Sequence, residues 1–143
     1  MKANDLVVVD TIVVSAMVNA HRGPVTAAGY RRLIDERSVV VSFATVTEMR
    51  YGVLKAGWGE LRRRGLERTL SQLVVVQPDD ALMTVCAGLR DRCERRGDAL
   101  GQKIHEADRW IAASALHLAV DLVSDDSVFQ DIEGLAVLAR PVT

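Results

Sequence analysis

The sequence has 143 residues, with 18 lysines and arginines against 19 aspartates and glutamates and a formal net charge of -1. This length suits a single domain over residues 1–143 with its own hydrophobic core, and the balanced charge gives no overall argument for a nucleic-acid or membrane partner. No apolar run reaches the length of a membrane span, and Asp5 and Asp10 interrupt the N-terminal apolar stretch before it could serve as a secretion signal. We therefore expect a soluble, cytoplasmic protein.

The first half of the chain alternates short β-branched runs with helical segments. LVVVD and SVVVS are typical of strands buried on both faces. The segment after each run has the composition of a helix packed on a sheet, and Gly57 is placed to end the longest of them. The predicted strands are 6–10 and 38–42, and the predicted helices are 11–20, 26–37 and 43–57.

The second half continues the alternation. Residues 58–73 form a charged helix or a helical hairpin, 73–78 a third strand that could be an edge strand, and Asp79 and Asp80 cap a long helix. Cys86 and Cys93 are seven residues apart in that helix, about 10 Å, which is too far for a disulfide, so we expect reduced core residues. The remaining predictions are a helix at 81–97, a loop at 98–104, a helix at 105–116, a strand at 121–126, a helical turn at 127–132 and a strand at 135–141. Strands alternating with helices in this way predict an α/β domain with a mostly parallel sheet.

One predicted helix carries a charge on its apolar stripe. Ile111, Ala112 and Ala115 lie three, four and seven residues after Asp108, so all four side chains share one face. Burying an unpaired carboxylate is costly, so such a group is normally paired, protonated or bound to a cation.

Three further acids join Asp108 where parallel strands end. Asp10 is the last residue of the first predicted strand, Asp126 comes just after DLVS, and Glu48 lies in the helix after SVVVS, beside the small residues Ala44, Thr45 and Gly52. Ligands of open parallel sheets bind beyond the carboxyl ends of the strands. Carboxylates gathered there repel one another unless some are protonated or a cation joins them.

A hard cation would satisfy this constellation. Oxygen ligands without cysteine or an essential histidine suit Mg²⁺ or Mn²⁺, and such sites commonly activate water and stabilise the developing charge of a phosphodiester. The alternative is that each acid only caps a helix or complements its dipole; Asp126 could cap the turn that follows it, and Glu48 could pair with Lys55.

At these residues the chain resembles a known family. VVVDTIVVSAM, SFATVTEMRYG, HEADRWIAASAL and DLVSDDSVFQDIEGLAVL are similar to successive blocks of PIN domains, especially the VapC-type toxins of bacterial toxin–antitoxin pairs. The resemblance covers nearly the whole chain and implies a three-layer α/β/α fold. It also implies a Mg²⁺- or Mn²⁺-dependent endoribonuclease that is commonly a homodimer and is held inactive by a cognate antitoxin. The family's acids match Asp10, Glu48, Asp108 and Asp126, and its hydroxyl positions near the metal match Thr11 and Ser124.

The chain departs from the family pattern at three places. Ile12 stands where the family often has Ser or Asn, and Val128 replaces a frequent acid. Asp125 adds a charge beside Asp126, and only the spacing to Phe129 selects Asp126 as the site residue.

Local positive charge could bind RNA. The run Arg62–Arg64 is either a solvated helix face or part of an RNA surface. We expect Trp58 to be the exposed aromatic residue and Trp110 to belong to the core, and His21 and His105 are weak catalytic candidates because a four-acid site needs no imidazole. The basic residues available to RNA are Arg50, Lys55, Arg62, Arg63, Arg64, Arg68, Arg95, Arg96 and Lys103.

Other functions fit less well. A haloacid-dehalogenase-type phosphatase needs a second aspartate where Ile12 stands, and a receiver domain needs a late lysine where the chain has Arg140. A catalytically inactive module that binds protein or RNA is the remaining alternative. For the toxin, helices 26–37 and 43–57 could provide the apolar groove for an antitoxin tail, and both transfer and ribosomal RNA stay open as substrates.

Overall fold

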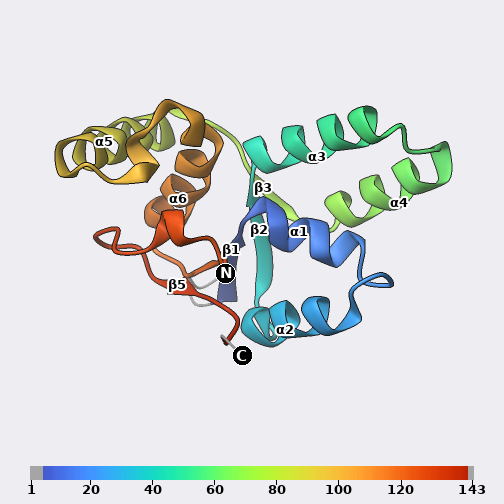
Figure 1. Ribbon diagram of the computed structural model, residues 1–143. Helices are drawn as coiled ribbons and strands as arrows, with labels where there is room; N and C mark the ends of the chain where they lie inside the picture. The colour runs from blue at the N-terminus through green and yellow to red at the C-terminus, as the bar shows by residue number, and fades with distance from the viewer. Residues whose placement is uncertain (1–4, 142–143) are drawn as a thin grey trace.

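In the computed structural model, which describes residues 5–141, helices pack on both faces of a central five-stranded sheet (Figure 1). All neighbouring strands are parallel, in the order β3-β2-β1-β4-β5. The predicted three-layer α/β fold is therefore confirmed. The strands are β1 (Leu6–Val9), β2 (Ser38–Ser42), β3 (Val74–Val76), β4 (Leu122–Val123) and β5 (Val137–Leu138).

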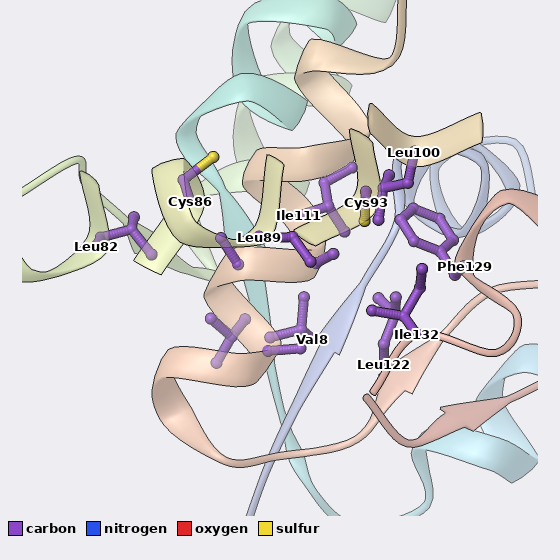
Figure 2. Close-up of a cluster of buried hydrophobic side chains, with 14 residues drawn as sticks. Val8, Leu82, Cys86, Leu89, Cys93, Leu100, Ile111, Leu122, Phe129 and Ile132 are labelled. Carbon is purple, nitrogen blue, oxygen red and sulfur yellow. The ribbon is translucent and has the colours of Figure 1, made fainter. Parts of the chain in front are cut away.

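Alternate side chains of β1 enter the two halves of the core. Val7 and Val9 pack with helices α1 (Thr11–Val18), α2 (Pro24–Ile34), α3 (Phe43–Ala56) and α4 (Glu60–Ser71). Val8 faces the opposite layer, formed by α5 (Asp80–Arg96) and α6 (Glu106–Leu118). Figure 2 shows Val8 and Leu122 of the sheet beneath Leu89 and Ile111 of these two helices. Two-faced burial explains why β1 is a nearly continuous run of valine.

Local sequence signals set most helix ends. Asp10, Ser42 and Asp79 cap α1, α3 and α5 with their side chains, and Gly57 and Gly97 end α3 and α5 in the left-handed conformation. Asp80, expected as a second cap, is the first residue of α5. Between α5 and α6, the expected loop contains two short 3₁₀ turns, η2 (Ala99–Gly101) and η3 (Lys103–His105), and a third, η4 (Ser127–Phe129), follows β4.

Some predicted bounds were wrong. The helix predicted over 26–37 begins at Pro24, because proline suits the first helical turn, and it ends at Ile34, because Asp35 takes a positive φ of 56°. The charged segment predicted over 58–73 is a single helix, α4, and not a hairpin in itself. It forms a helical hairpin with α3, the helix that precedes it (Figure 1). The strands predicted over 121–126 and 135–141 keep only two residues each.

Two other expectations from the sequence can be compared with the structure. Both cysteines are free and buried, as predicted, and β3 lies at an edge of the sheet. Among the described residues, no helix combines the length and hydropathy needed to cross a bilayer.

Candidate metal-binding site

Asp10 lies at the centre of the candidate site, at the carboxyl end of the central strand. Its side chain is 4 % exposed, accepts a hydrogen bond from the backbone N–H of Val13 at 3.0 Å and caps α1. The Ser124 hydroxyl donates to its other carboxylate oxygen. Burial raises the pKa of Asp10 above its ordinary value, and the charges of Asp126 and Asp108 raise it further, against the lowering effect of the two hydrogen bonds.

Ser124 joins Asp10 to Asp126. It follows β4, which is paired with β1, so the two strand ends are neighbours. While the Ser124 hydroxyl donates to Asp10, its oxygen accepts from the backbone N–H of Asp126 at 3.0 Å. The Asp126 carboxylate itself caps η4 by accepting from the N–H of Val128 at 2.9 Å. Asp126 therefore caps the turn that follows it, which was the alternative expected from the sequence, and also lies next to Asp10.

Glu48 approaches the same place from α3. Its residue is exposed, but the surrounding protein desolvates its carboxyl enough to raise its pKa, and Asp108 and Asp10 raise that pKa further. The Thr11 hydroxyl is a hydrogen-bond partner of Glu48 and lies 3.1 Å from the hydroxyl of Thr45. Thr11, which follows Asp10 in the sequence, thus opposes the other effects by lowering the pKa of Glu48.

Asp108 is half-buried in the first turn of α6, on the side that continues into buried Ile111 and Ala112. Its carboxylate lies 2.8 Å from Nδ1 of His105. Sequence reasoning set His105 aside, so this contact was missed. The only signal available was the spacing of three residues, which brings side chains together at a helix start.

Asp125 is held by residues outside the four acids. Its carboxylate accepts hydrogen bonds from the Tyr30 hydroxyl at 2.9 Å and from the backbone and side chain of Arg140 at 2.7 and 2.6 Å. Partial burial alone would raise the pKa of Asp125, but the hydrogen bonds from Arg140 and Tyr30 lower it below its usual value. Asp126, whose charge acts on Asp10, is the member of the pair that belongs with the other acids.

The four predicted acids thus lie in or next to four different elements, and each interacts electrostatically with at least one of the others. Across residues 5–141, however, no three His, Cys, Asp or Glu side chains are placed so that they could hold a metal ion in their present positions. The donor set is all oxygen, which fits Mg²⁺ or Mn²⁺, and a carboxylate bonded to one or two protein donors keeps free lone pairs for a cation. The residues therefore fit a hard cation in their chemistry, and the side chains need to move to coordinate one.

The surface residues expected to bind RNA are partly engaged in other contacts. Arg50 donates two hydrogen bonds to the carboxylate of Glu67. The Arg62 guanidinium lies 3.7 Å from the ring centroid of Trp58. Trp58 is thus half-buried under Arg62, so the expectation of a freely exposed ring is wrong. Trp110 is half-buried too, edge-on against Phe43 and packed on the core as expected.

Comparison with protein families matches residues 7–135 to the PIN domain. The match spans β1 to the turn before β5 and includes all four acids. Comparison with curated protein sequences gives no match.

Solved structures with the same fold cover nearly the whole chain. VapBC2 from Rickettsia felis, bound to a DNA fragment from its promoter, gives a TM-score of 0.78 at 21 % identity, covering 95 % of this chain and 99 % of that one. VapBC-1 from Haemophilus influenzae gives 0.71 at 25 %, with coverage of 94 and 97 %. VapBC-5 from Mycobacterium tuberculosis, a member of the VapBC family of toxin–antitoxin systems, gives 0.65 at 27 %, with coverage of 96 and 99 %.

Proposed function

This chain belongs to the PIN-domain family, and from that membership we propose that it is a Mg²⁺- or Mn²⁺-dependent endoribonuclease, the toxin of a toxin–antitoxin pair. One observation carries the proposal: at the carboxyl edge of the sheet, buried Asp10 is joined to Asp126 through Ser124, and the charge of Asp108 raises the pKa of both Asp10 and Glu48. A protein gains nothing in stability from gathering four carboxylates there, so their arrangement is best explained by a cation and the phosphodiester it attracts.

The four acids would hold the cation, and the neighbouring hydroxyl and imidazole groups would orient them. When bound, the cation supplies the positive charge that activates water and stabilises the phosphodiester as it is cleaved. Ser124 bonds to both Asp10 and the backbone of Asp126, His105 contacts Asp108, and the Thr11 hydroxyl lowers the pKa of Glu48. Such partners commonly tune a site as strongly as its ligands do.

The RNA strand would extend from the acids over the cationic hairpin of α3 and α4. Within the described chain, Lys55, Arg63 and Arg68 form no ion pair and are exposed, so they are available to phosphates. Transfer and ribosomal RNA are both candidate substrates, and selectivity would depend on this surface.

An antitoxin is the proposed protein partner. The related structures are toxin–antitoxin complexes, and α3 carries exposed apolar side chains, with Tyr51 at 61 % and Leu54 at 64 % exposure. Leu54 also lines a hollow of about 260 Å³ between α3 and α4. These features suit an apolar tail that folds on binding. The homodimer implied by the family resemblance stays a prediction.

The direct test is to incubate the purified chain, free of partner, with total cellular RNA in Mg²⁺, Mn²⁺ or EDTA. We expect discrete fragments that require the cation and disappear in Asp108→Asn. Removing one metal-binding carboxylate should lower the rate by at least about a hundredfold. Mapping the fragment ends would then identify the RNA and the cleavage site.

Asp121→Asn is the matched control. Asp121 lies at the opposite end of β4, where it pairs with Arg37 at 2.8 Å, so its loss should leave cleavage intact. Folded protein that neither cleaves RNA nor binds Mn²⁺ would contradict the proposal and favour a catalytically inactive PIN module that binds protein or RNA.

A further inference from the structure

Three segments far apart in the sequence meet at the Asp125 carboxylate. The Tyr30 hydroxyl from α2 donates to one oxygen, which also accepts from the Arg140 side chain, while the Arg140 backbone N–H donates to the other oxygen. The Arg140 guanidinium also lies over the Tyr30 ring, 4.7 Å from its centroid. These contacts close a ring between Tyr30, Asp125 and Arg140, which we name the Asp125 clamp.

The local structure is built to accommodate the clamp. Tyr30 is 1 % exposed, so its ring is fixed in the core, and its hydroxyl is held next to Asp125. A Cβ atom at Gly29 would lie 3.0 Å from Cδ of Arg140. The absence of a side chain at Gly29 therefore leaves the space through which the arginine reaches the tyrosine.

The sheet alone holds this region weakly. β4 and β5 are two residues long and pair at Leu122↔Val137 and Val123↔Leu138. The backbone bonds beside these pairs run from the Leu122 N–H to the Ala136 carbonyl at 2.9 Å and, at the turn, from the Ser124 N–H to the Leu138 carbonyl at 3.0 Å. Beyond that bond, the ladder gives the Ser124–Asp126 turn no support. The clamp connects this turn to Tyr30 of α2 and to Arg140, which lies two residues after the end of β5.

In the sequence, Asp125 lies between Ser124 and Asp126, two residues of the candidate site. Ser124 bonds to Asp10, and Asp126, the residue on the other side of Asp125, has an extended backbone with φ of -74° and ψ of 126°. In a backbone of this extended kind, neighbouring side chains point to different sides of the chain. Holding Asp125 toward Tyr30 and Arg140 therefore keeps the Asp126 side chain on another side of the chain, where it caps η4.

We propose that Tyr30 and Arg140 are positioning residues of the carboxylate site, which act through Asp125 to hold Asp126 in place for cation binding. The inference rests on the proposed function, because it needs the site to bind a cation. It goes further in assigning a role to two residues for which the described structure gives no hydrogen bond or ion pair with the four acids, although the charge of Asp10 acts on Tyr30.

Charge and positioning predict opposite effects for one substitution. Arg140→Gln removes a positive charge from the neighbourhood of a cation site, and by Coulomb's law alone this should tighten Mn²⁺ binding. If Arg140 positions Asp126, its loss should weaken Mn²⁺ binding instead. The sign of the change in Kd therefore separates the two effects.

The experiment is a Mn²⁺ titration of the full chain, with free Mn²⁺ followed by electron paramagnetic resonance. We expect Arg140→Gln to raise Kd about tenfold, the scale seen when outer partners of metal ligands are lost. Tyr30→Phe, which keeps the buried ring, should raise Kd by a smaller factor. Arg140→Lys, which can still pair with Asp125, should recover part of the loss. Circular dichroism checks that each variant is folded.

Arg37→Gln is the matched control, because Arg37 forms a comparable pair with Asp121 before β4 and also bonds to backbone carbonyls of α2. Its Kd should equal that of the wild type. Unchanged or tighter Mn²⁺ binding by Arg140→Gln, or equal weakening by Arg37→Gln, would overturn the positioning role proposed for the Asp125 clamp. If Asp108→Asn bound Mn²⁺ as tightly as the wild type, the proposed function would be overturned as well. The two failures are therefore distinguishable.

Discussion

Asp10 combines two roles that conflict in the absence of a cation. Its carboxylate caps α1 and accepts from Ser124, and both bonds favour the charged form. Burial and the nearby acids disfavour that form and raise its pKa in the folded protein. A buried acid with a raised pKa destabilises the fold wherever it is forced to ionise.

This conflict predicts how stability depends on pH in the metal-free protein. Because the folded state holds the Asp10 proton more tightly than the unfolded chain does, the contribution of Asp10 is most favourable below the unfolded pKa of about 4 and is lost as pH rises through the raised folded pKa. Asp10→Asn keeps an oxygen to cap α1 but carries no charge. We expect it to increase the free energy of unfolding by about 1 kcal/mol at pH 7 in EDTA, and by less at pH 4.

Urea denaturation of both proteins at the two pH values measures this difference. The control is Asp79→Asn, which changes a helix cap of the same type outside the candidate site. A less stable Asp10→Asn at pH 7 would mean that the lost charge-assisted hydrogen bonds outweigh the relief of burial.

At the scale of elements, the entry into α6 depends on how closely η2 approaches α5. A Cβ atom at Gly101 would lie 2.8 Å from the backbone nitrogen of Glu94 and 3.1 Å from the carbonyl carbon of Cys93. Neither backbone atom can move away without shifting the end of α5. Gly101→Ala should therefore lower the free energy of unfolding by about 1–3 kcal/mol, the usual cost of overpacking.

Gly52→Ala is the opposite case on α3. A Cβ atom there meets nothing within 4 Å, so the substitution should stabilise the helix by about 0.5–1 kcal/mol through the lower backbone entropy cost. Thermal denaturation of the two variants checks both signs. Equal effects at the two positions would show that the contact between η2 and α5 is not close in solution.

The sequence predicted elements where local patterns act and missed contacts between distant segments. The valine runs identified β1 and β2, and Gly57 marked the end of α3. The end of α2 was misplaced because a positive φ at Asp35 has no sequence signal comparable to glycine. The proximity of Asp10 and Asp126 could be predicted because the parallel strands β1 and β4 end at one edge, while the role of the four acids stays a prediction. The bond between Tyr30 and Asp125 spans 95 residues and leaves no local pattern.

At the scale of the whole molecule, the candidate site brings together elements that strand pairing and side-chain packing already hold side by side, as between β1 and β4 and between Phe43 of α3 and Trp110 of α6. Asp10 follows β1, Glu48 lies on α3, Asp108 begins α6 and Asp126 follows β4. These elements include helices from both faces of the sheet (Figure 1). A cation bound by all four acids would therefore link the two helical layers at one edge of the sheet, so its binding energy would add to the stability of the entire fold.

Cation binding should consequently raise the melting temperature. At a free Mn²⁺ concentration one hundred times Kd, linkage adds about 2.7 kcal/mol, which for a domain of this size corresponds to a shift of roughly 5–10 °C. The shift should increase with the logarithm of Mn²⁺ concentration and vanish in Asp108→Asn. It should also reverse the order of stability, because Asp10→Asn is expected to be the more stable protein in EDTA and the less stable one in Mn²⁺. Differential scanning calorimetry measures both effects, and a shift of the same size in Asp108→Asn would assign the Mn²⁺ binding to another part of the surface.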